Sequence, residues 1–351
     1  MKRSLAALMG SLMVGCGGGG SSAPPTPPPP NPLYVRVSGN DTNTGTDPTT
    51  ALRTISKAAL IARDGYTIIV GTGTYREGVT TDRTGNPAQA LRFIADESGA
   101  QTGDGPGPVV IDAAGSRVGA GFRISKSPGT LIDGFTITHG SDGGIVIKSG
   151  SHDLTIEHCT VFNNSGDGIR VQDSRSVLIL NNLIYANGGL GLGIVGQGSG
   201  SHDVRIFNNT VVDNGTRGIT IGNTQAGSPG AMLRNNIVQN NGGDSNIRVY
   251  TPPPASVPRS EVGYDEDFDL VFPPTFRPDN LPHGGHVLVT DAQFVNQGGG
   301  DYHVSGSSPT IDKGFDLNLP SGELDRLHER TTTRVDADIG PLDLGYHFLP
   351  Q

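Results

Sequence analysis

The chain has no tryptophan, only two cysteines, and aromatic side chains at just 5% of its 351 residues. Charged residues are also scarce, at 17%, which is low for a helical or α/β enzyme. These shortages disfavour a compact core of bulky side chains and a framework of internal disulfides. The sequence has 53 glycines and 25 prolines instead, which indicate dense turns between many short strands.

The charge balance bears on the kind of partner. The formal net charge is −9 at pH 7, so a nucleic-acid backbone should be repelled, and no nucleic-acid partner is expected. An acidic glycan stays open, because a local basic strip or a bound cation overrides net charge.

The first 32 residues predict export rather than fold. A basic start and a short apolar run lead into Leu12-Met13-Val14-Gly15-Cys16. This stretch resembles the bacterial lipobox, although Met13 stands where that motif usually has leucine. The resemblance implies a signal peptide over 1–15, lipidation of Cys16, and a Gly/Ser/Pro-rich tether over 16–32. We therefore expect an exported protein, lipid-anchored in the bacterial cell envelope at the outer membrane, facing the periplasm or the surface; an ordinary signal peptide is the alternative.

Internal repetition predicts the fold class. One strand register recurs every 23 to 27 residues, at Ile132, Ile156, Ile179, Ile206 and Leu233. Asparagine stands three positions after the last three of these anchors and eight positions after the last four. Amides that repeat at the strand spacing of about 4.8 Å can each donate to one neighbour and accept from the other. We therefore predict two asparagine ladders, formed by Asn182, Asn209 and Asn236, and by Asn164, Asn187, Asn214 and Asn241.

A second strand in each repeat begins with glycine, so two registers share one period and define a coil. Because parallel crossovers are overwhelmingly right-handed, the predicted fold is all-β: a right-handed, single-stranded parallel β-helix. One face of a short N-terminal helix, formed by Ile55, Ala58, Ala59 and Ala62, would cap the open core. We divide the chain into an N-terminal cap with the first coils over 33–128, regular coils over 129–250, a Pro-rich irregular excursion over 251–285, and final coils with a C-terminal cap over 286–351.

Two groups of motifs resemble known proteins. Tyr34 to Asp41, Arg53 to Ala58 and Gly73 to Glu77 are similar to the N-terminal cap of the pectate-lyase-like β-helix superfamily, which includes the family 9 polysaccharide lyases. Ser308 to Gly314 and Asp336 to Gly340 resemble the closing segment of exported choice-of-anchor β-helix proteins. The resemblance covers roughly residues 33–348 and implies a scaffold that hosts lyases, hydrolases, epimerases and proteins without activity.

The outward residues of the second strand should form a polar column. Counting from Gly121, Gly144, Gly168 and Gly193 brings five side chains to one face. Such a strip suits a polysaccharide lying along the coil, while a merely solvated sheet face is the alternative. The predicted ligand-binding residues are Arg123, Lys148, Arg170, Gln172 and Gln197.

A lyase needs a base and positive charge beside a uronate carboxylate, and Lys148 and Arg170 are weak candidates for these roles. No cofactor is certain, but calcium is an option, with Asp142 and Asp167 as weak candidate ligands. The superfamily's lyases draw several calcium carboxylates and a lysine base from neighbouring coils, and this sequence does not match that complete set. Asp133 and Glu157 form a further stacked carboxylate pair.

Two other features favour structural roles. The repeated Ser-His-Asp tripeptides around His152 and His202 occupy equivalent turns, where neighbours in sequence cannot form a catalytic triad. Cys159 points into the core and is expected to be an inert packed thiol.

Two hypotheses follow. The first is a monomeric envelope lipoprotein that binds a polysaccharide along the outward sheet face. Lyase-like processing of that polysaccharide is an optional part of this hypothesis. The second is a non-catalytic surface, adhesion or stalk protein. Whether the protein is an enzyme stays open at this stage.

Overall fold

The computed structural model describes residues 31–84, 90–196, 200–223, 228, 230–250, 264–278, 281, 283–317, 319, 321–333, 338 and 340–348. Cys16 and the predicted tether up to residue 30 lie outside the described residues, so lipidation stays a prediction. Within the described ranges, no helix has the length and apolar character needed to cross a membrane.

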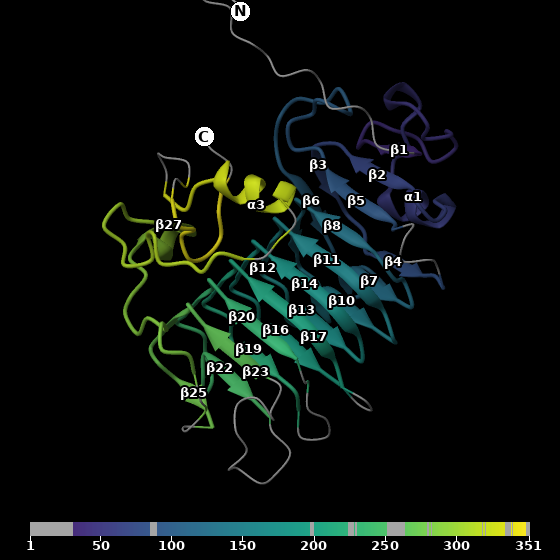
Figure 1. Ribbon diagram of the computed structural model, residues 1–351. Helices are drawn as coiled ribbons and strands as arrows, with labels where there is room; N and C mark the ends of the chain where they lie inside the picture. The colour runs from purple at the N-terminus through teal and green to yellow at the C-terminus, as the bar shows by residue number, and fades with distance from the viewer. Residues whose placement is uncertain are drawn as a thin grey trace, which may run out of the picture.

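The chain winds into a stack of coils, each of which adds one short strand to each of three parallel sheets (Figure 1). Sheet A has nine strands: β1 (Pro32–Val35), β2 (Thr67–Val70), β5 (Arg92–Ala95), β8 (Leu131–Asp133), β11 (His152–Glu157), β14 (Arg175–Leu180), β17 (His202–Phe207), β20 (Ala231–Arg234) and β23 (Tyr264–Asp267). Sheet B has eight: β3 (Gly73–Tyr75), β6 (Val109–Asp112), β9 (Thr136–Thr138), β12 (Thr160–Phe162), β15 (Leu183–Tyr185), β18 (Thr210–Val212), β21 (Ile237–Gln239) and β24 (Leu270–Phe272). Sheet C has eight: β4 (Val79–Asp82), β7 (Ala120–Ser125), β10 (Gly143–Lys148), β13 (Asp167–Gln172), β16 (Leu190–Val195), β19 (Arg217–Ile221), β22 (Ile247–Val249) and β25 (Phe276–Arg277). The predicted all-β parallel solenoid is confirmed.

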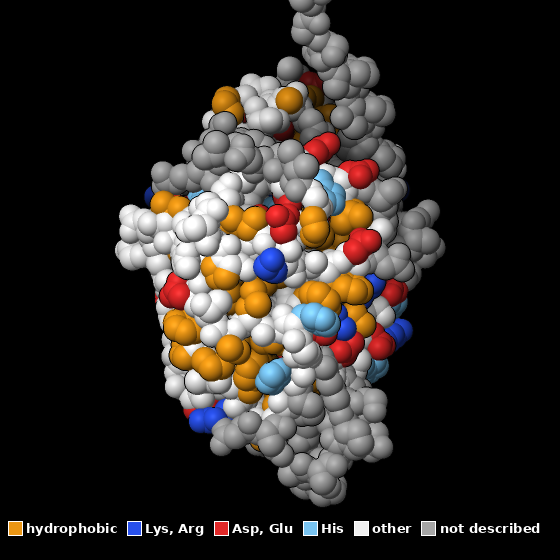
Figure 2. All heavy atoms as spheres, turned by 60° about the vertical axis from the view of Figure 1, so that its left-hand side comes forward, with side chains coloured by type: hydrophobic (Ala, Val, Ile, Leu, Met, Phe, Trp, Pro, Cys, Tyr) orange, Lys and Arg blue, Asp and Glu red, His pale blue; other side chains and the backbone are white. Residues whose placement is uncertain are grey.

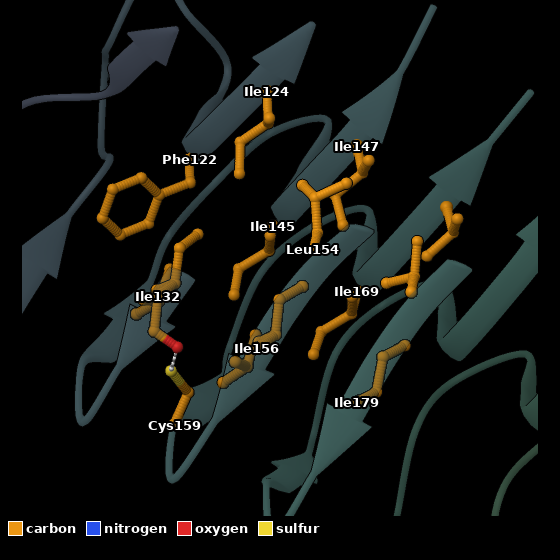
Figure 3. Close-up of a cluster of buried hydrophobic side chains, with 14 of the residues drawn as sticks. Phe122, Ile124, Ile132, Ile145, Ile147, Leu154, Ile156, Cys159, Ile169 and Ile179 are labelled. Atoms are coloured by element: carbon orange, nitrogen blue, oxygen red, sulfur yellow. Dashed lines mark hydrogen bonds between the residues drawn. The ribbon is translucent and has the colours of Figure 1, made fainter. Parts of the chain in front are cut away.

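Alternate strand residues fill the space between the three sheets with stacked aliphatic side chains (Figure 3). Ile132, Ile156 and Ile179 pair rung to rung, as their spacing predicted. Cys159 lies in this core, where its thiol contacts the Ile132 carbonyl oxygen at 3.9 Å. Burial raises the pKa of the Cys159 thiol, which keeps it protonated and agrees with the expected inert role.

Both predicted asparagine ladders are present at the corners of the coils. In the first ladder, each amide nitrogen donates to the next amide oxygen, at 3.0 Å from Asn182 to Asn209 and 3.0 Å from Asn209 to Asn236. The second ladder repeats the pattern at 2.9 Å for each step. Each amide nitrogen also donates to buried backbone carbonyls, so the ladders satisfy polar groups that the corners would leave without partners. The second ladder comprises Asn164, Asn187, Asn214 and Asn241.

A column of glycines in the sheet C strands makes room for the second ladder. A Cβ atom at Gly168 would lie 2.5 Å from Ile184 Cγ2 and 2.9 Å from Asn187 Nδ2, distances that real Cβ atoms do not adopt. A Cβ atom at Gly191 would clash in the same way with Val211 and with Asn214 of the ladder. A Cβ atom at Gly193 would lie near neither a core valine nor a ladder asparagine. Gly191 is therefore the repeat glycine of its coil, and counting from Gly193 in the sequence was wrong by two residues.

A short helix near the N-terminus, α1 (Ile55–Ile61), follows the 3₁₀ turn η1 (Pro48–Thr50). Thr54 caps the helix by accepting a hydrogen bond from the Lys57 amide, and the Glu77 carboxylate accepts from the first two amides of the helix. Its predicted apolar face is buried against β1, β2 and β4. Closure of the open core by this helix stays a prediction.

The excursion predicted over 251–285 is shorter than expected. Its second half forms another coil, because β23, β24 and β25 pair with β20, β21 and β22. The Pro-rich composition hid the short strands, and residues 251–263 lie outside the described residues.

The prediction of final coils and an end cap over 286–351 is wrong for the described part of that range. Leu288 adds one parallel bridge to Leu270, and the chain then runs back along the side of the stack (Figure 1). It forms an antiparallel hairpin of β26 (Phe294–Asn296) and β27 (Asp301–Val304) with the 3₁₀ turn η3 (Gln297–Gly299), and the helix α3 (Ser321–His328). We call residues 286–348 the C-terminal segment. Most of its apolar residues bury outward side chains of the coils, whereas Val287 packs against the inner core.

A third asparagine column attaches the C-terminal segment to the coils. Asn181 donates to the His347 carbonyl at 3.0 Å and accepts from the His347 amide at 2.6 Å. Asn235 exchanges hydrogen bonds with the Phe315 backbone in the same way. These asparagines stand in the left-handed conformation at the corner between sheets A and B, which asparagine tolerates better than most residues.

The first ladder ends in a carboxyl group. Asn236 donates its backbone and side-chain N–H groups to Asp269 Oδ1, at 2.6 and 2.9 Å. Burial and the neighbouring Glu266 raise the pKa of Asp269 well above its usual value. The folded chain therefore keeps a proton on Asp269 that the unfolded chain releases above about pH 4.

Asp269→Asn is expected to reduce the loss of stability that the protein shows as the pH rises. The wild-type free energy of unfolding should fall between about pH 4 and the folded-state pKa, because only the folded state still binds the proton there. Urea unfolding at pH 5 and pH 8 measures this fall, which should be smaller in the variant. Equal pH dependence in the two proteins contradicts the assignment; Asp316→Asn, at an exposed carboxylate, is the control.

Candidate functional site

The C-terminal segment covers two of the three sheet faces. On sheet B, Leu183 and Val212 pack against Tyr302. At the edge of sheet A, Leu180 and Phe207 pack against leucines that include Leu327 of α3. Figure 2 shows this covered side, where hydrophobic side chains gather and Lys and Arg are scattered singly. Within the described ranges, none of the hydrophobic clusters of the segment includes an outward residue of β7, β10 or β13, so the segment does not cover this part of the sheet C face.

Outward residues of sheet C stack in register over successive coils. Arg123, Val146 and Arg170 pair across β7, β10 and β13, as predicted. Lys148 pairs with Ser125 in the neighbouring column, also as predicted. The first column continues through both ends of the sheet as Thr80, Arg123, Val146, Arg170, Gly193, Thr220, Arg248 and Arg277.

The prediction that Gln197 lies in this polar column is wrong. Arg170 pairs with Gly193, and Gln172 pairs with Val195, so valine occupies the rung that the sequence count gave to Gln197. Strand β16 contains two glycines, Gly191 and Gly193, and only Gly191 packs over the asparagine ladder. The prediction counted from Gly193, so it placed Gln197 two residues away from its true register. Gln197 itself lies outside the described residues.

Two of the predicted arginines share one carboxylate. Arg123 Nη2 lies 2.7 Å from Asp142 Oδ2, and Arg170 Nη2 lies 2.6 Å from Asp142 Oδ1, so Asp142 bridges two coils. Partial burial raises the pKa of Asp142, but the hydrogen bonds from both arginines outweigh it and hold that pKa below its usual value. The group is an ordered Arg–carboxylate–Arg array with donors and acceptors that face solvent.

The second predicted metal ligand belongs to the same array. Asp167 accepts a hydrogen bond from the Leu190 amide at 2.9 Å and lies 3.4 Å from Arg170. Burial raises its pKa above the usual value. A calcium site needs six to eight oxygen ligands, whereas a guanidinium occupies the space between these two carboxylates. The described residues here do not form such a set, and calcium binding stays a prediction.

Among the predicted cations of sheet C, Lys148 makes no hydrogen bond or ion pair within the described part of the chain. The predicted amide Gln172 lies with its Nε2 atom 3.5 Å from Asp173 Oδ2. As a base, Lys148 fits the chemistry better than Arg170. A guanidinium that is ion-paired to two aspartates has neither a free lone pair nor freedom to move. Arg170 is therefore suited to binding and positioning rather than to proton transfer.

A second array of the same type lies further along sheet C and was missed in the sequence. Asp244 accepts from Arg217 at 2.5 Å and from Arg248 at 2.5 Å. The Arg248 guanidinium also lies 4.6 Å from the centre of the Tyr250 ring. Asp244 lies in a turn where the repeat is irregular, so its position could not be predicted from the period. Only Arg248, which lies in the sheet C column, could have been placed from the sequence.

The stacked pair Asp133 and Glu157 is buried rather than outward and open. Arg326 of α3 lies 2.9 Å from Asp133 Oδ2 and 3.0 Å from Glu157 Oε1. His158 Nδ1 lies 2.8 Å from Asp133 Oδ1 and 3.0 Å from Arg326 Nη2. Burial lowers the pKa of His158 to about 4, so the imidazole is neutral at pH 7. We call these four residues the Arg326 cluster.

The Arg326 cluster contains three side chains that could ligate a metal, since their ligand atoms lie within 4.8 Å of one another. Arg326 binds both carboxylates, so a cation already lies among the candidate ligands, whereas the buried His158 Nε2 has no hydrogen-bond partner among the described residues. A second acidic group, Asp312, Asp338 and Asp343, is likewise engaged, with Asp338 held by His347 at 2.7 Å. The sequence analysis found the stacked pair Asp133 and Glu157 but missed Arg326, which lies 169 positions from Glu157. It also missed the second acidic group.

The Ser-His-Asp repeats serve turns, as expected. His152 is 2.7 Å from its neighbour Asp153, but the Ser151 hydroxyl donates to the Lys148 carbonyl at 3.0 Å. Ser201 binds the Val195 carbonyl in the same way. The serines therefore close turns, and no triad geometry arises at these described positions.

Comparison with known proteins supports the fold. Residues 109–242 match the family model described as "Right handed beta helix region". The structure is similar to that of the pectate lyase Pel9A, with 15% identity and a TM-score of 0.55, over 90% of this chain and 97% of that chain. It is also similar to an alginate lyase from Paenibacillus sp. str. FPU-7, with 14% identity and a TM-score of 0.50, over 70% of this chain and 78% of that chain. No curated protein matches the chain. Together with the stacked coils and ladders, these findings show that the chain has a parallel β-helix fold, which is similar to the folds of these two lyases.

Proposed function

We propose that the protein binds a polysaccharide along the outward face of sheet C. The observation that carries the proposal is the column of charged side chains held at rung spacing on the face that the C-terminal segment leaves open. Rungs are about 4.8 Å apart, so Arg123 and Arg170, which are two rungs apart, would contact an extended glycan at intervals along its length. The two neighbours of known structure that support this proposal are named as lyases of pectate and alginate, both acidic polysaccharides.

Paired arginines and aspartates suit glycans for a physical reason. A sugar hydroxyl both donates and accepts, so it can bind the free lone pairs of Asp142 and the outward N–H groups of Arg123 or Arg170 at once. The ion pairs fix these groups before binding, which lowers the entropy lost when a glycan is ordered.

Lyase-like processing is the finer part of the proposal. In that reaction the neutral amine of Lys148 would take the proton from the carbon next to the uronate carboxylate, while Arg170 on the next coil would bind the carboxylate and favour the charge that develops. The C–O bond to the neighbouring sugar would then break to leave a C=C bond, with the departing oxygen taking a proton from water. Lys148 and Gln172 occupy the rung positions beside the column that contains Arg170, so a sugar over β10 and β13 would reach both.

The envelope location is proposed from the sequence alone. Lipidation of Cys16 and the Pro-rich tether would hold the solenoid away from the membrane as a monomer, with sheet C accessible to glycans. Metabolic labelling with a fatty acid, followed by mass spectrometry of the N-terminal peptide, tests this in the full chain and in Cys16→Ser.

A tether-free protein should bind uronate oligosaccharides, and Lys148→Met with Arg170→Met should weaken that binding by about tenfold or more, because two cationic contacts are lost. Calorimetry over oligogalacturonates and oligomannuronates measures the affinity, and absorbance of unsaturated products reports cleavage.

Arg92→Met with Arg175→Met is the matched control, because it removes the same charge from exposed positions of sheet A. Equal weakening in both double variants, or no binding by the wild type across the panel, would overturn the proposal. Binding without any product would leave the binding function and reject the lyase step.

The second candidate is a non-catalytic surface or adhesion protein with the solenoid as a platform. The ion pairs on sheet C favour this candidate, because both candidate calcium ligands, Asp142 and Asp167, are already paired with arginines and Arg170 is paired with both of them. Retained glycan binding with no product, with or without added calcium, would be its signature.

A further inference from the structure

A hollow of ≈ 290 Å³ lies on a different face, between sheet A and the C-terminal segment. Thr155, Leu178 and Arg205 form its floor as direct neighbours on three successive coils. Leu319 of the C-terminal segment forms one wall. The volume of the hollow is that of a small ligand site, enough for one or two sugar rings.

Three polar side chains of this hollow lack partners. The Thr155 and Ser176 hydroxyls and the Arg205 guanidinium make no hydrogen bond or ion pair within the ranges that the structure describes. Other serines at the ends of sheet A strands, such as Ser151 and Ser201, are engaged with backbone carbonyls. The convergence of free donors on one concave place is therefore a local property and not a general feature of this face.

The remaining lining completes a pattern that selects one ligand class. Leu178 and Leu319 offer apolar surface to the C–H face of a sugar ring, and Asp153 offers an acceptor for its hydroxyls. Arg205 is the cationic group of the lining and matches a carboxylate with two parallel N–H donors. A sugar that has both hydroxyls and a carboxylate uses all of these groups, whereas a neutral sugar leaves the guanidinium without a partner.

We propose that this hollow is a second saccharide site, specific for a uronate residue, with Arg205 binding the carboxylate. It is separate from the sheet C face and does not require that face to bind anything. Its wall is positioned by the packing of the leucines around Leu317 and Leu327 on Leu178 and Leu180, so the order of the C-terminal segment and the affinity of the site are coupled.

The test uses the tether-free protein with Lys148→Met and Arg170→Met already introduced, so that the contribution of sheet C is reduced. Trigalacturonate and trimannuronate, and the methyl ester of each, are titrated by calorimetry. We expect a uronate form to bind more tightly than its methyl ester, and Arg205→Met to weaken the acid form by at least about tenfold while leaving the ester unchanged.

Arg175→Met is the matched control, since Arg175 is exposed on the adjacent strand, pairs in register with His202, and does not line the hollow. Its affinity should equal that of the parent protein. Equal affinity of acid and ester, an unchanged affinity in Arg205→Met, equal losses in both arginine variants, or no binding of either acid would overturn the proposal. Melting temperatures exclude unfolding, since an exposed arginine without ion pairs should shift them little.

Discussion

Asn209→Ala is expected to lower the free energy of unfolding by at least about 3 kcal/mol, because it leaves several buried polar groups without partners. The Asn209 amide nitrogen donates to the Ile179 carbonyl at 2.9 Å, the Phe207 carbonyl at 2.9 Å and the Asn236 amide oxygen at 3.0 Å. Its oxygen accepts two N–H groups of Asn182. Alanine removes all five contacts at a site that no solvent reaches.

Chemical denaturation of the tether-free protein, followed by far-ultraviolet circular dichroism, measures this loss. Asn240→Gly is the matched control, since Asn240 is an exposed corner asparagine with a φ of 53° that glycine adopts without strain. The control should change stability by less than about 0.5 kcal/mol. Similar midpoints for the two variants would show that the ladder does not stabilise the stack.

Arg326→Met is expected to destabilise the protein by on the order of 2 kcal/mol and to loosen the C-terminal segment. Removal of the guanidinium leaves Asp133 and Glu157 as a buried like-charged pair, which is costly. The loss should stay below that of a fully buried pair, because the Arg326 side chain is 40% exposed. Limited proteolysis should cut near α3 faster than in the wild type.

The pH dependence of the Arg326→Met effect has a fixed sign. Burial raises the pKa of Asp133, but contacts with His158 and Arg326 outweigh it and hold that pKa below its usual value. The stabilisation from this carboxylate is therefore present above about pH 4 and is lost as the pH falls through the folded-state pKa. The difference between wild type and variant should shrink in acid. Lys313→Met removes one exposed charge of the same segment and should change neither stability nor cleavage; an equal effect would reject the cluster's role.

The repeating part of the fold could be predicted from sequence because stacking imposes a period on it. Each coil must place an aliphatic residue such as Ile156 inward and an amide such as Asn182 at a corner, so both recur at fixed intervals. The same logic located Arg123, Lys148 and Arg170 on one face. The same reasoning misplaced Gln197, because Gly191 and Gly193 have similar apolar neighbours in the sequence. Only the structure shows that Gly191, and not Gly193, packs over Val211 and Asn214.

The C-terminal segment could not be predicted from periodicity, because it does not coil. Its contacts are set by complementarity with outward residues far away in the sequence, such as Leu180 and Asn181 against Leu327 and His347. A sequence pattern shows that Leu180 and Phe207 are apolar at outward positions, and this was the available signal that something covers them. The pairing of Asp142 with two arginines escaped prediction for a similar reason, since side chains in a turn do not follow the strand register.

The crystal structure of the tether-free protein with the uronate oligosaccharide that binds most tightly tests the central claim most directly. We predict an extended sugar chain over β10 and β13, with Arg170 and Lys148 in contact with it. A chain bound along the C-terminal segment on sheet B, with sheet C bare, would contradict the claim.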